Sequence, residues 1–206
     1  MKTRTHLSRL IPALLVKAFI AAWITFAFFH PFDDDEFQHT HFSWLINKGQ
    51  LPYKDFFEHH MPVYHLFLSP LFFLTGGSAG IFLFRLVSVV SGLGTLLCVY
   101  LLSKRYASRT ASALMVIIMG LTPMFMFKIV EARPASPAML ALSMAMLLLF
   151  GKEKGKWSDL TAGILAGLCV LLSQKYVFVT AGLILALIIQ KRWRACLLTF
   201  MGMIIP

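Results

Sequence analysis

Long apolar stretches separated by short charged clusters make up most of this 206-residue chain. About 20 apolar residues in helical form cross the hydrocarbon core of a bilayer, so the pattern predicts membrane-spanning helices. We expect an all-α fold, a polytopic transmembrane helical bundle that forms a single module over residues 1–206. The expected spans are residues 11–29, 79–102, 111–130, 137–150, 160–173, 177–189 and 197–206, the last one incomplete.

One polar region, residues 30–78, interrupts this pattern and is expected to be a loop on the outer face. Residues 35–48 suit a helix that lies in the membrane interface, with Asp33 or Asp34 as its cap and Gly49 at its end. Residues 62–74 are apolar but too short to cross comfortably, so we expect a second juxtamembrane helix there.

The composition agrees with a membrane protein, because 58% of the residues are hydrophobic and only 14% are charged. The net charge of +10 does not indicate nucleic-acid binding, since the positive residues form short clusters between apolar stretches. The three cysteines lie inside apolar stretches without metal-binding spacing, so neither a disulfide framework nor a zinc knuckle is expected.

The basic clusters set the orientation, because positive residues favour the cytoplasmic side. If residues 62–74 stay at the surface, the strong clusters all fall on one side, together with the N-terminus. These clusters are Lys104 with Arg105 and Arg109, residues 152–156, and Lys191 with Arg192 and Arg194. We expect an integral protein of a bacterial-type inner membrane. The short final stretch indicates the N-terminal part of a longer protein.

In this topology the unusual polar residues meet on the outer face. Six of the nine acidic residues and six of the seven histidines lie between positions 30 and 65. Ionisable groups at a membrane are costly and often functional, so this side is the expected site. The candidate residues are Asp35, Glu36, His39, Glu58, His59, His60, Glu131, Arg133 and Lys175.

Each candidate has a functional and a plainer interpretation. Asp35 and Glu36 are suited to act as a general base or to hold a divalent metal, but acids also stabilise a helix N-terminus. Glu58 is suited to a metal, and His59 or His60 to a phosphate, but the three residues also fit a solvated loop.

The basic candidates near later turns are open to the same two interpretations. Arg133 suits a phosphate or an ion pair with Glu131, and Lys175 suits a phosphate or an interfacial anchor. Arg85 and Lys128 are expected to be interfacial anchors at the outer ends of their spans.

The outer region resembles the first outer loop of GT-C glycosyltransferases, which include protein O-mannosyltransferases and the aminoarabinose transferase of lipid A. The resemblance is carried by DEFQHTHFSWLINKGQLPYKDFFEHHMPVYHLFLSPLFFLTG, residues 35–76. Its marks are Asp35 with Glu36, the Gly-x-x-Pro-Tyr segment from Gly49, the Glu58 to Pro62 segment, and Arg85.

The resemblance implies an inverting transfer of a sugar from a polyprenyl-phosphate donor to an acceptor on the extracytoplasmic face. Asp35 matches the expected base, with Glu36 beside it. Glu58 with His59 or His60 matches positions near the donor phosphate or a metal, and Lys175 matches a basic residue at the fifth span. The implied partners are the lipid donor, the bilayer, and a protein partner or the missing C-terminal half.

One position departs from the family pattern. Many relatives carry an aspartate just after an Arg-Pro pair, where this chain has Ala135 and Ser136. A non-catalytic protein of the same fold, which binds polyprenyl lipid or a partner enzyme, is therefore the first alternative. A small transporter is the second, although the spans lack a convincing mid-membrane charge.

Overall fold

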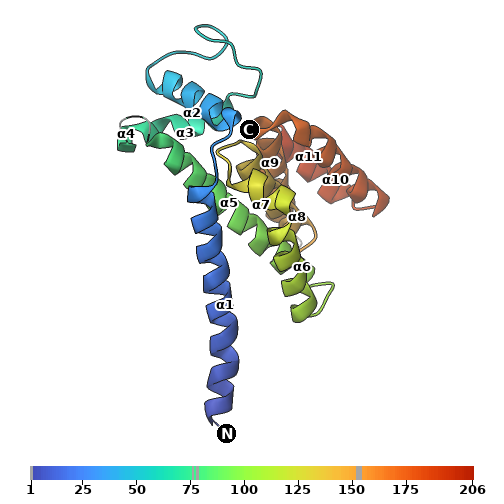
Figure 1. Ribbon diagram of the computed structural model, residues 1–206. Helices are drawn as coiled ribbons and strands as arrows, with labels where there is room; N and C mark the ends of the chain where they lie inside the picture. Colours follow the sequence, from blue (N-terminus) through green and yellow to red (C-terminus); the bar gives the residue numbers. More distant parts are fainter. Residues whose placement is uncertain (1, 76, 78, 152–154) are drawn as a thin grey trace.

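The computed structural model describes residues 2–75, 77, 79–151 and 155–206, with side chains in the first helix given for Leu14 and from Val16 onward. All regular structure in these residues is helical, as expected (Figure 1). Residues 152–154 of the expected basic cluster at 152–156 lie outside the described part of the chain.

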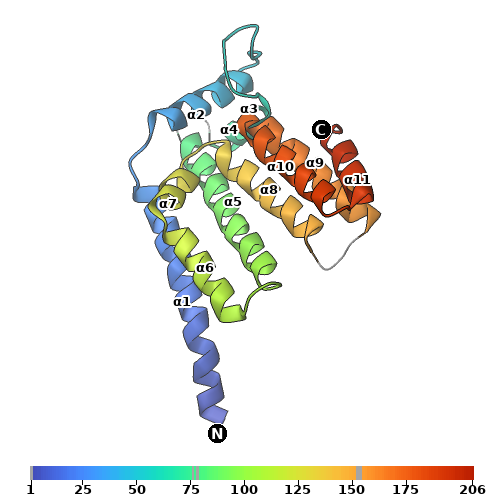
Figure 2. The ribbon, with the colours of Figure 1, turned by 90° about the vertical axis from the view of Figure 1, so that its right-hand side faces the viewer.

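Helix α1 (Lys2–Phe29) is the longest helix, and the N-terminus lies at its far end (Figures 1 and 2). It is anchored through Trp23, which is only 1% exposed and whose indole N–H donates to the carbonyl of Gly120 at 3.3 Å. The buried indole packs beside Phe125, so the end of α1 near Phe29 is fixed against the bundle.

Helix α2 (Asp34–Asn47) is found where a helix over residues 35–48 was expected, and its place at a membrane surface stays a prediction. Asp33 is its cap: the Asp33 side chain accepts from the backbone N–H of Asp35, and Glu36 completes a capping box. The helix ends before Gly49, whose φ of +86° favours glycine.

The second predicted surface helix is divided into three short pieces. These are α3 (Val63–Leu68), the 3₁₀ turn η1 (Ser69–Leu71) and α4 (Phe72–Thr75). These pieces follow one another over Val63–Thr75, where the second surface helix was expected, and the 3₁₀ turn falls at Pro70, which lacks the N–H that an uninterrupted α-helix needs.

Helix α5 (Gly80–Ser103) is the one described helix that is by itself long and apolar enough to span a membrane. The predicted span at 111–130 is broken into α6 (Arg109–Leu121) and α7 (Pro123–Val130), bent by 66°. The break lies at Thr122, because the residue before a proline avoids helical geometry.

The remaining helices are shorter than the usual span. They are α8 (Ala135–Leu149), α9 (Lys156–Leu172), the 3₁₀ turn η2 (Gln174–Tyr176), α10 (Val177–Ile189) and α11 (Trp193–Met203). By length and composition the described chain holds one candidate span, or two if the bent α6–α7 pair is counted. The polytopic membrane bundle therefore stays a prediction.

The core brings distant segments to one end of α5. Buried Tyr64, Phe84 and Leu142 pack together between α3, α5 and α8, while Trp23 and Ile129 join α1 to α7. As a result α2 and α3 lie across the beginning of α5, next to the turn between α7 and α8 (Figure 2). This meeting of segments forms the candidate site.

Candidate functional site

A fully buried ion pair joins α2 to α5. Glu36 and Arg85 are both 0% exposed, and Arg85 donates through Nε to Glu36 Oε1 at 2.8 Å and through Nη2 to Oε2 at 2.6 Å. The other donors reach the carbonyls of Ala27, His30 and Pro31 at 2.8–3.0 Å. All five N–H groups of the guanidinium are therefore bonded, which offsets the cost of burying the charge.

The Glu36 carboxylate also fixes the backbone on both sides of the site. It accepts the N–H of Asp33 at 3.1 Å and the N–H of Ala132 at 2.7 Å. Ala132 precedes Arg133 in the turn between α7 and α8, and Asp35 precedes Glu36 in α2. One buried carboxylate thus sets where Asp35 and Arg133 stand relative to each other.

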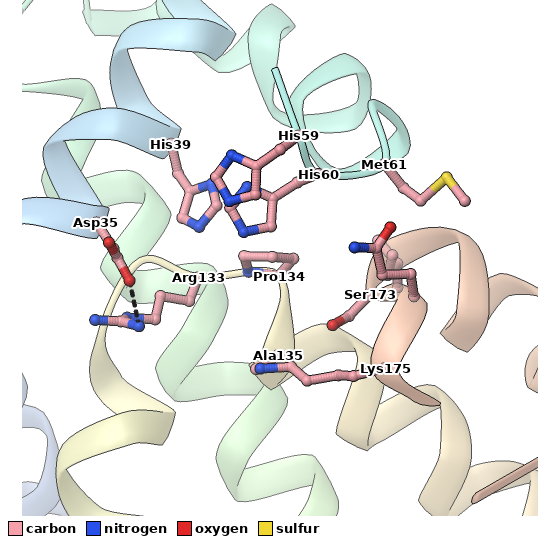
Figure 3. A pocket seen from close by; sticks show the side chains of 12 residues that line it. Asp35, His39, His59, His60, Met61, Arg133, Pro134, Ala135, Ser173 and Lys175 are labelled. Carbon is pink, nitrogen blue, oxygen red and sulfur yellow. Dashed lines mark ion pairs between the residues drawn. The ribbon is translucent and has the colours of Figure 1, made fainter. Parts of the chain in front are cut away.

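Arg133 lies among three carboxylates at this end of the bundle. Its Nη1 is 2.6 Å from Asp35 Oδ2, and this ion pair is drawn as a dashed line in Figure 3. Its Nη2 is 2.5 Å from Asp33 Oδ1, and its Nε is 2.5 Å from Glu131 Oε2. Lys128 is 2.9 Å from Glu131. The backbone N–H of Asp35 and the nearby Arg133 charge hold the pKa of Asp33 below its ordinary value.

A group of histidines lies across from this cluster. His39 of α2 and His65 of α3 are both buried, with His39 Nδ1 at 3.0 Å from His65 Nε2, so one ring donates and the other accepts. Burial lowers the pKa of His39 to about 3, helped by nearby His65, and lowers that of His65 to about 4. The pair is therefore neutral at neutral pH.

Glu58, His59 and His60 form a compact set of ligand atoms that lie within 4.8 Å of one another. His60 Nδ1 is 2.6 Å and His59 Nδ1 is 3.4 Å from Glu58 Oε1. Glu58 is 2% exposed, and its Oε2 has no hydrogen-bond partner within the part of the chain that the structure describes. One carboxylate with two imidazoles fits a divalent metal such as zinc.

A pocket of about 220 Å³ opens between these groups (Figure 3). Among the described residues, Asp35 is the one carboxylate on its wall. The pocket is lined by Asp35, His39, His59, His60, Met61, Arg133, Pro134, Ala135, Leu172, Ser173, Gln174 and Lys175. Segments that are up to 140 positions apart in the sequence, Asp35 to Lys175, therefore share one cavity.

Lys175 is the cation of this pocket that remains available. It belongs to η2 and points across the cavity toward Ala135 (Figure 3). Within the described residues no carboxylate oxygen lies within 4 Å of its ammonium group, whereas Arg133 is shared by three acids. An anion that enters the pocket therefore meets an uncompensated positive charge at Lys175.

Six of the nine candidate residues line the pocket: Asp35, His39, His59, His60, Arg133 and Lys175. Glu36, Glu58 and Glu131 lie behind it, each at most 2% exposed. Glu36 has no exposed surface through which to meet an acceptor. The structure places Glu36 in the buried pair with Arg85, and its catalytic role beside Asp35 stays a prediction.

Arg85 and Asp33 were undervalued by the sequence analysis. Arg85 is not an interfacial anchor but a buried partner of Glu36, and Asp33 binds Arg133 as well as capping α2. A signal was present for Arg85, because a lone cation in an apolar stretch requires a partner.

The position that departs from the family pattern lies on the pocket wall. Ala135 lines the cavity, and the buried Ser136 hydroxyl donates to the carbonyl of Ile129 at 2.9 Å. This wall therefore carries no acid, and Asp35 stands alone as the candidate base.

Comparison with known proteins agrees with this architecture. The chain falls in the class of GT-C-type glycosyltransferases. It belongs to the dolichyl-phosphate-mannose-protein mannosyltransferase family, whose model matches residues 59–205. His59, His60, Arg85, Arg133 and Lys175 lie within the matched residues, whereas Asp35 and Glu36 precede them. No curated protein and no solved structure matches the chain.

The buried pair predicts a strong effect of removing one partner. Arg85→Met leaves the Glu36 charge buried without a counter-charge, and should lower the free energy of unfolding by about 3–5 kcal/mol. The double variant Glu36→Gln/Arg85→Met should recover much of this loss, because no charge is then stranded. Unfolding in detergent measures both, with the exposed Arg109→Met as control. A single-variant loss no larger than that of the control contradicts the assignment.

The histidine pair predicts a loss of stability in acid. His39 and His65 stay neutral in the folded chain down to about pH 4, while the unfolded chain protonates them below about pH 6.5. Above pH 6.5 the two histidines contribute their full amount to the free energy of unfolding. Below pH 6.5 this contribution should fall, for each histidine, by up to about 1.4 kcal/mol per pH unit. His39→Asn should flatten this dependence of the melting temperature, and the exposed His41→Asn should not. Parallel curves for the two variants would contradict the prediction.

Proposed function

We propose that this chain is a membrane glycosyltransferase that transfers a sugar, with inversion, from a polyprenyl-phosphate donor to an acceptor on the extracytoplasmic face. Membership in the mannosyltransferase family supports the reaction class. The observation that carries the proposal is that the polar pocket shares part of its wall with an apolar cavity.

The apolar cavity has a volume of about 550 Å³ and lies beside the pocket, against α6, α7 and α8. Arg133, Ala135 and Lys175 line both cavities, and most other residues of the second one are apolar, including Met119, Phe125 and Met139. A polyprenyl-phosphate sugar has an apolar tail attached to a charged phosphate. The two cavities suit its two parts, with the phosphate beside Lys175 and the tail on the apolar wall.

In this proposal Asp35 is the general base. Its carboxylate takes the proton of the acceptor hydroxyl as the acceptor oxygen forms a bond to the anomeric carbon. The bond from that carbon to the phosphate oxygen breaks, and polyprenyl phosphate leaves with the electron pair. Lys175 stabilises the charge on the leaving phosphate, because no described carboxylate neutralises the positive charge of the lysine.

The other polar groups of the pocket support these two. Arg133 keeps Asp35 directed at the cavity through their 2.6 Å ion pair and presents its remaining charge to the phosphate. His59 and His60 border the opposite wall. A divalent metal held by Glu58 with these histidines would supply further positive charge for the phosphate.

We further infer that the chain crosses the membrane several times, with its N-terminus in the cytoplasm of a bacterial-type cell. The distribution of charge supports this. Lys104, Arg105 and Arg192 surround the end of the bundle opposite the pocket, as the positive-inside rule requires for a cytoplasmic end. The pocket then faces the other side, where polyprenyl-linked sugars would be used.

A non-catalytic lipid-binding protein is the second candidate, and one observation favours it. Ala135 leaves a pocket wall without the acid that many relatives carry there. Such a protein would bind polyprenyl phosphate through Lys175 and show no turnover, so binding and transfer must be measured separately.

Asp35→Asn should abolish transfer while leaving the fold intact, because an amide does not accept the proton. The measurement is transfer of labelled mannose from dolichyl-phosphate mannose by the protein in membranes. Asp34→Asn is the matched control, since Asp34 is the exposed neighbour and does not line the pocket. Turnover by Asp35→Asn at the wild-type rate would remove Asp35 from the mechanism.

Lys175→Gln should weaken binding of dolichyl phosphate roughly tenfold or more, the usual cost of losing a hydrogen bond to a charged group. Binding is measured by titration in detergent. Lys54→Gln, an exposed lysine of the loop before α3, serves as the control and should bind as the wild type does. Equal losses in both variants would show that the charge acts only at long range.

Single cysteines test the orientation. A cysteine at Gln50 should react with an impermeant maleimide added outside intact cells, and one at Ser108 should react only after the membrane is opened. Both positions are exposed in the fold, so access is decided by the membrane alone. The unmodified chain gives the background from its native cysteines, and the reverse labelling would overturn the orientation.

A further inference from the structure

A second polar cavity lies at the end of the bundle opposite the Asp35 pocket. Its volume is about 710 Å³, and it lies where the α5–α6 and α10–α11 turns meet the end of α8 (Figure 2). Its polar wall includes Lys104, Arg105, Tyr106 and Arg192. Ala135 lines the Asp35 pocket and Phe150 lines the second cavity, at the two ends of α8, whose 15 residues span about 22 Å, so one phosphate group cannot occupy both.

The arginines of this basic cavity are held in place by the backbone. Arg105 Nη1 donates to the carbonyl of Phe150 at 3.0 Å, and Arg192 Nη1 donates to that of Leu149 at 2.8 Å. Arg192 is also 3.7 Å from Asp159. Among the described residues, which leave out 152–154, no carboxylate lies within 4 Å of Lys104 or Arg105.

Gly151 lines this cavity at the end of α8, next to Arg105. A Cβ at position 151 would lie 2.4 Å from the carbonyl oxygen of Leu147 and 2.7 Å from Arg105 Nη1. Both distances are shorter than van der Waals contact allows. A larger residue would therefore require the backbone near Leu147 to shift, whereas the flexible Arg105 side chain can move aside.

We propose that this basic cavity binds a phosphate group, carried by an anionic phospholipid headgroup or free in solution. Three cations converge on a space large enough for a headgroup, and preorganised guanidinium groups suit phosphate oxygens. The apolar side chains of Leu101 and Phe150 border the same cavity, as a lipid at the membrane surface would require. The inference rests on the proposed membrane arrangement and is independent of sugar transfer.

Capping of α8 is the competing explanation for the arginines, because cations stabilise the C-terminal end of a helix. Lys104 separates the two explanations. It lines the cavity and lies 5.1 Å from the ring centre of Tyr100, and it is not among the described donors to the carbonyls of α8. A loss of phosphate binding on removal of Lys104 therefore does not follow from capping.

The test compares lipids that remain bound to the purified chain. Native mass spectrometry should find phosphatidylglycerol retained in preference to phosphatidylcholine. Lys104→Gln should lower this retention about fivefold, the expected effect of one cation near a lipid surface, and Lys104→Gln/Arg105→Gln should lower it further. Arg109→Gln is the control, because Arg109 is an exposed arginine of the same turn that does not line the cavity.

A second arm identifies a soluble ligand. Inorganic phosphate should raise the melting temperature of the chain in phosphatidylcholine nanodiscs, and Lys104→Gln should reduce this shift, if the group is taken from solution. Preference for phosphatidylglycerol without this shift assigns the cavity to lipid. The proposal is overturned if neither ligand is preferred, or if Arg109→Gln loses as much binding as Lys104→Gln.

Discussion

The buried ion pair between Glu36 and Arg85 is the interaction on which the rest of the site depends. Taking two charges out of water is costly, and this pair offsets the cost with a bidentate contact and with backbone partners for every remaining donor. Those backbone partners come from the end of α1 and the chain leading to α2. The Glu36 carboxylate also accepts the N–H of Ala132, in the turn before α8. The pair therefore fixes the segments that carry Asp35 and Arg133.

The number of nearby carboxylates differs between Arg133 and Lys175, and this difference separates the roles that we propose for them. Arg133 is surrounded by Asp33, Asp35 and Glu131, so much of its charge is already used in positioning the acids. Lys175 comes from a separate turn and meets no such cluster among the residues described. In the proposed mechanism, a phosphate that reaches the pocket gains most from Lys175, while Asp35 is directed toward the acceptor. The apolar cavity beside both cations would then hold the lipid tail of the proposed donor.

Sequence patterns predicted the helices well where each depended on local chemistry. Asp33 as the cap of α2 and the apolar stretch of α5 were both confirmed. Pro70 and Pro123 divide helices that hydropathy alone treats as continuous, because hydropathy does not register a missing N–H. Charge bias placed the polar candidates on one face, and six of the nine line the pocket, but it did not predict that the Glu36 side chain turns inward. That depends on Arg85, 49 positions away, and such long-range pairing has no local signal.

A crystal or cryo-electron microscopy structure with bound dolichyl phosphate tests the account most directly. The account predicts a phosphate in contact with Lys175 Nζ, the tail against α6 and α7, and the Glu36–Arg85 pair intact beneath Asp35. A phosphate bound away from Lys175, or a Glu36 side chain that faces the pocket with Arg85 unpaired, would contradict it.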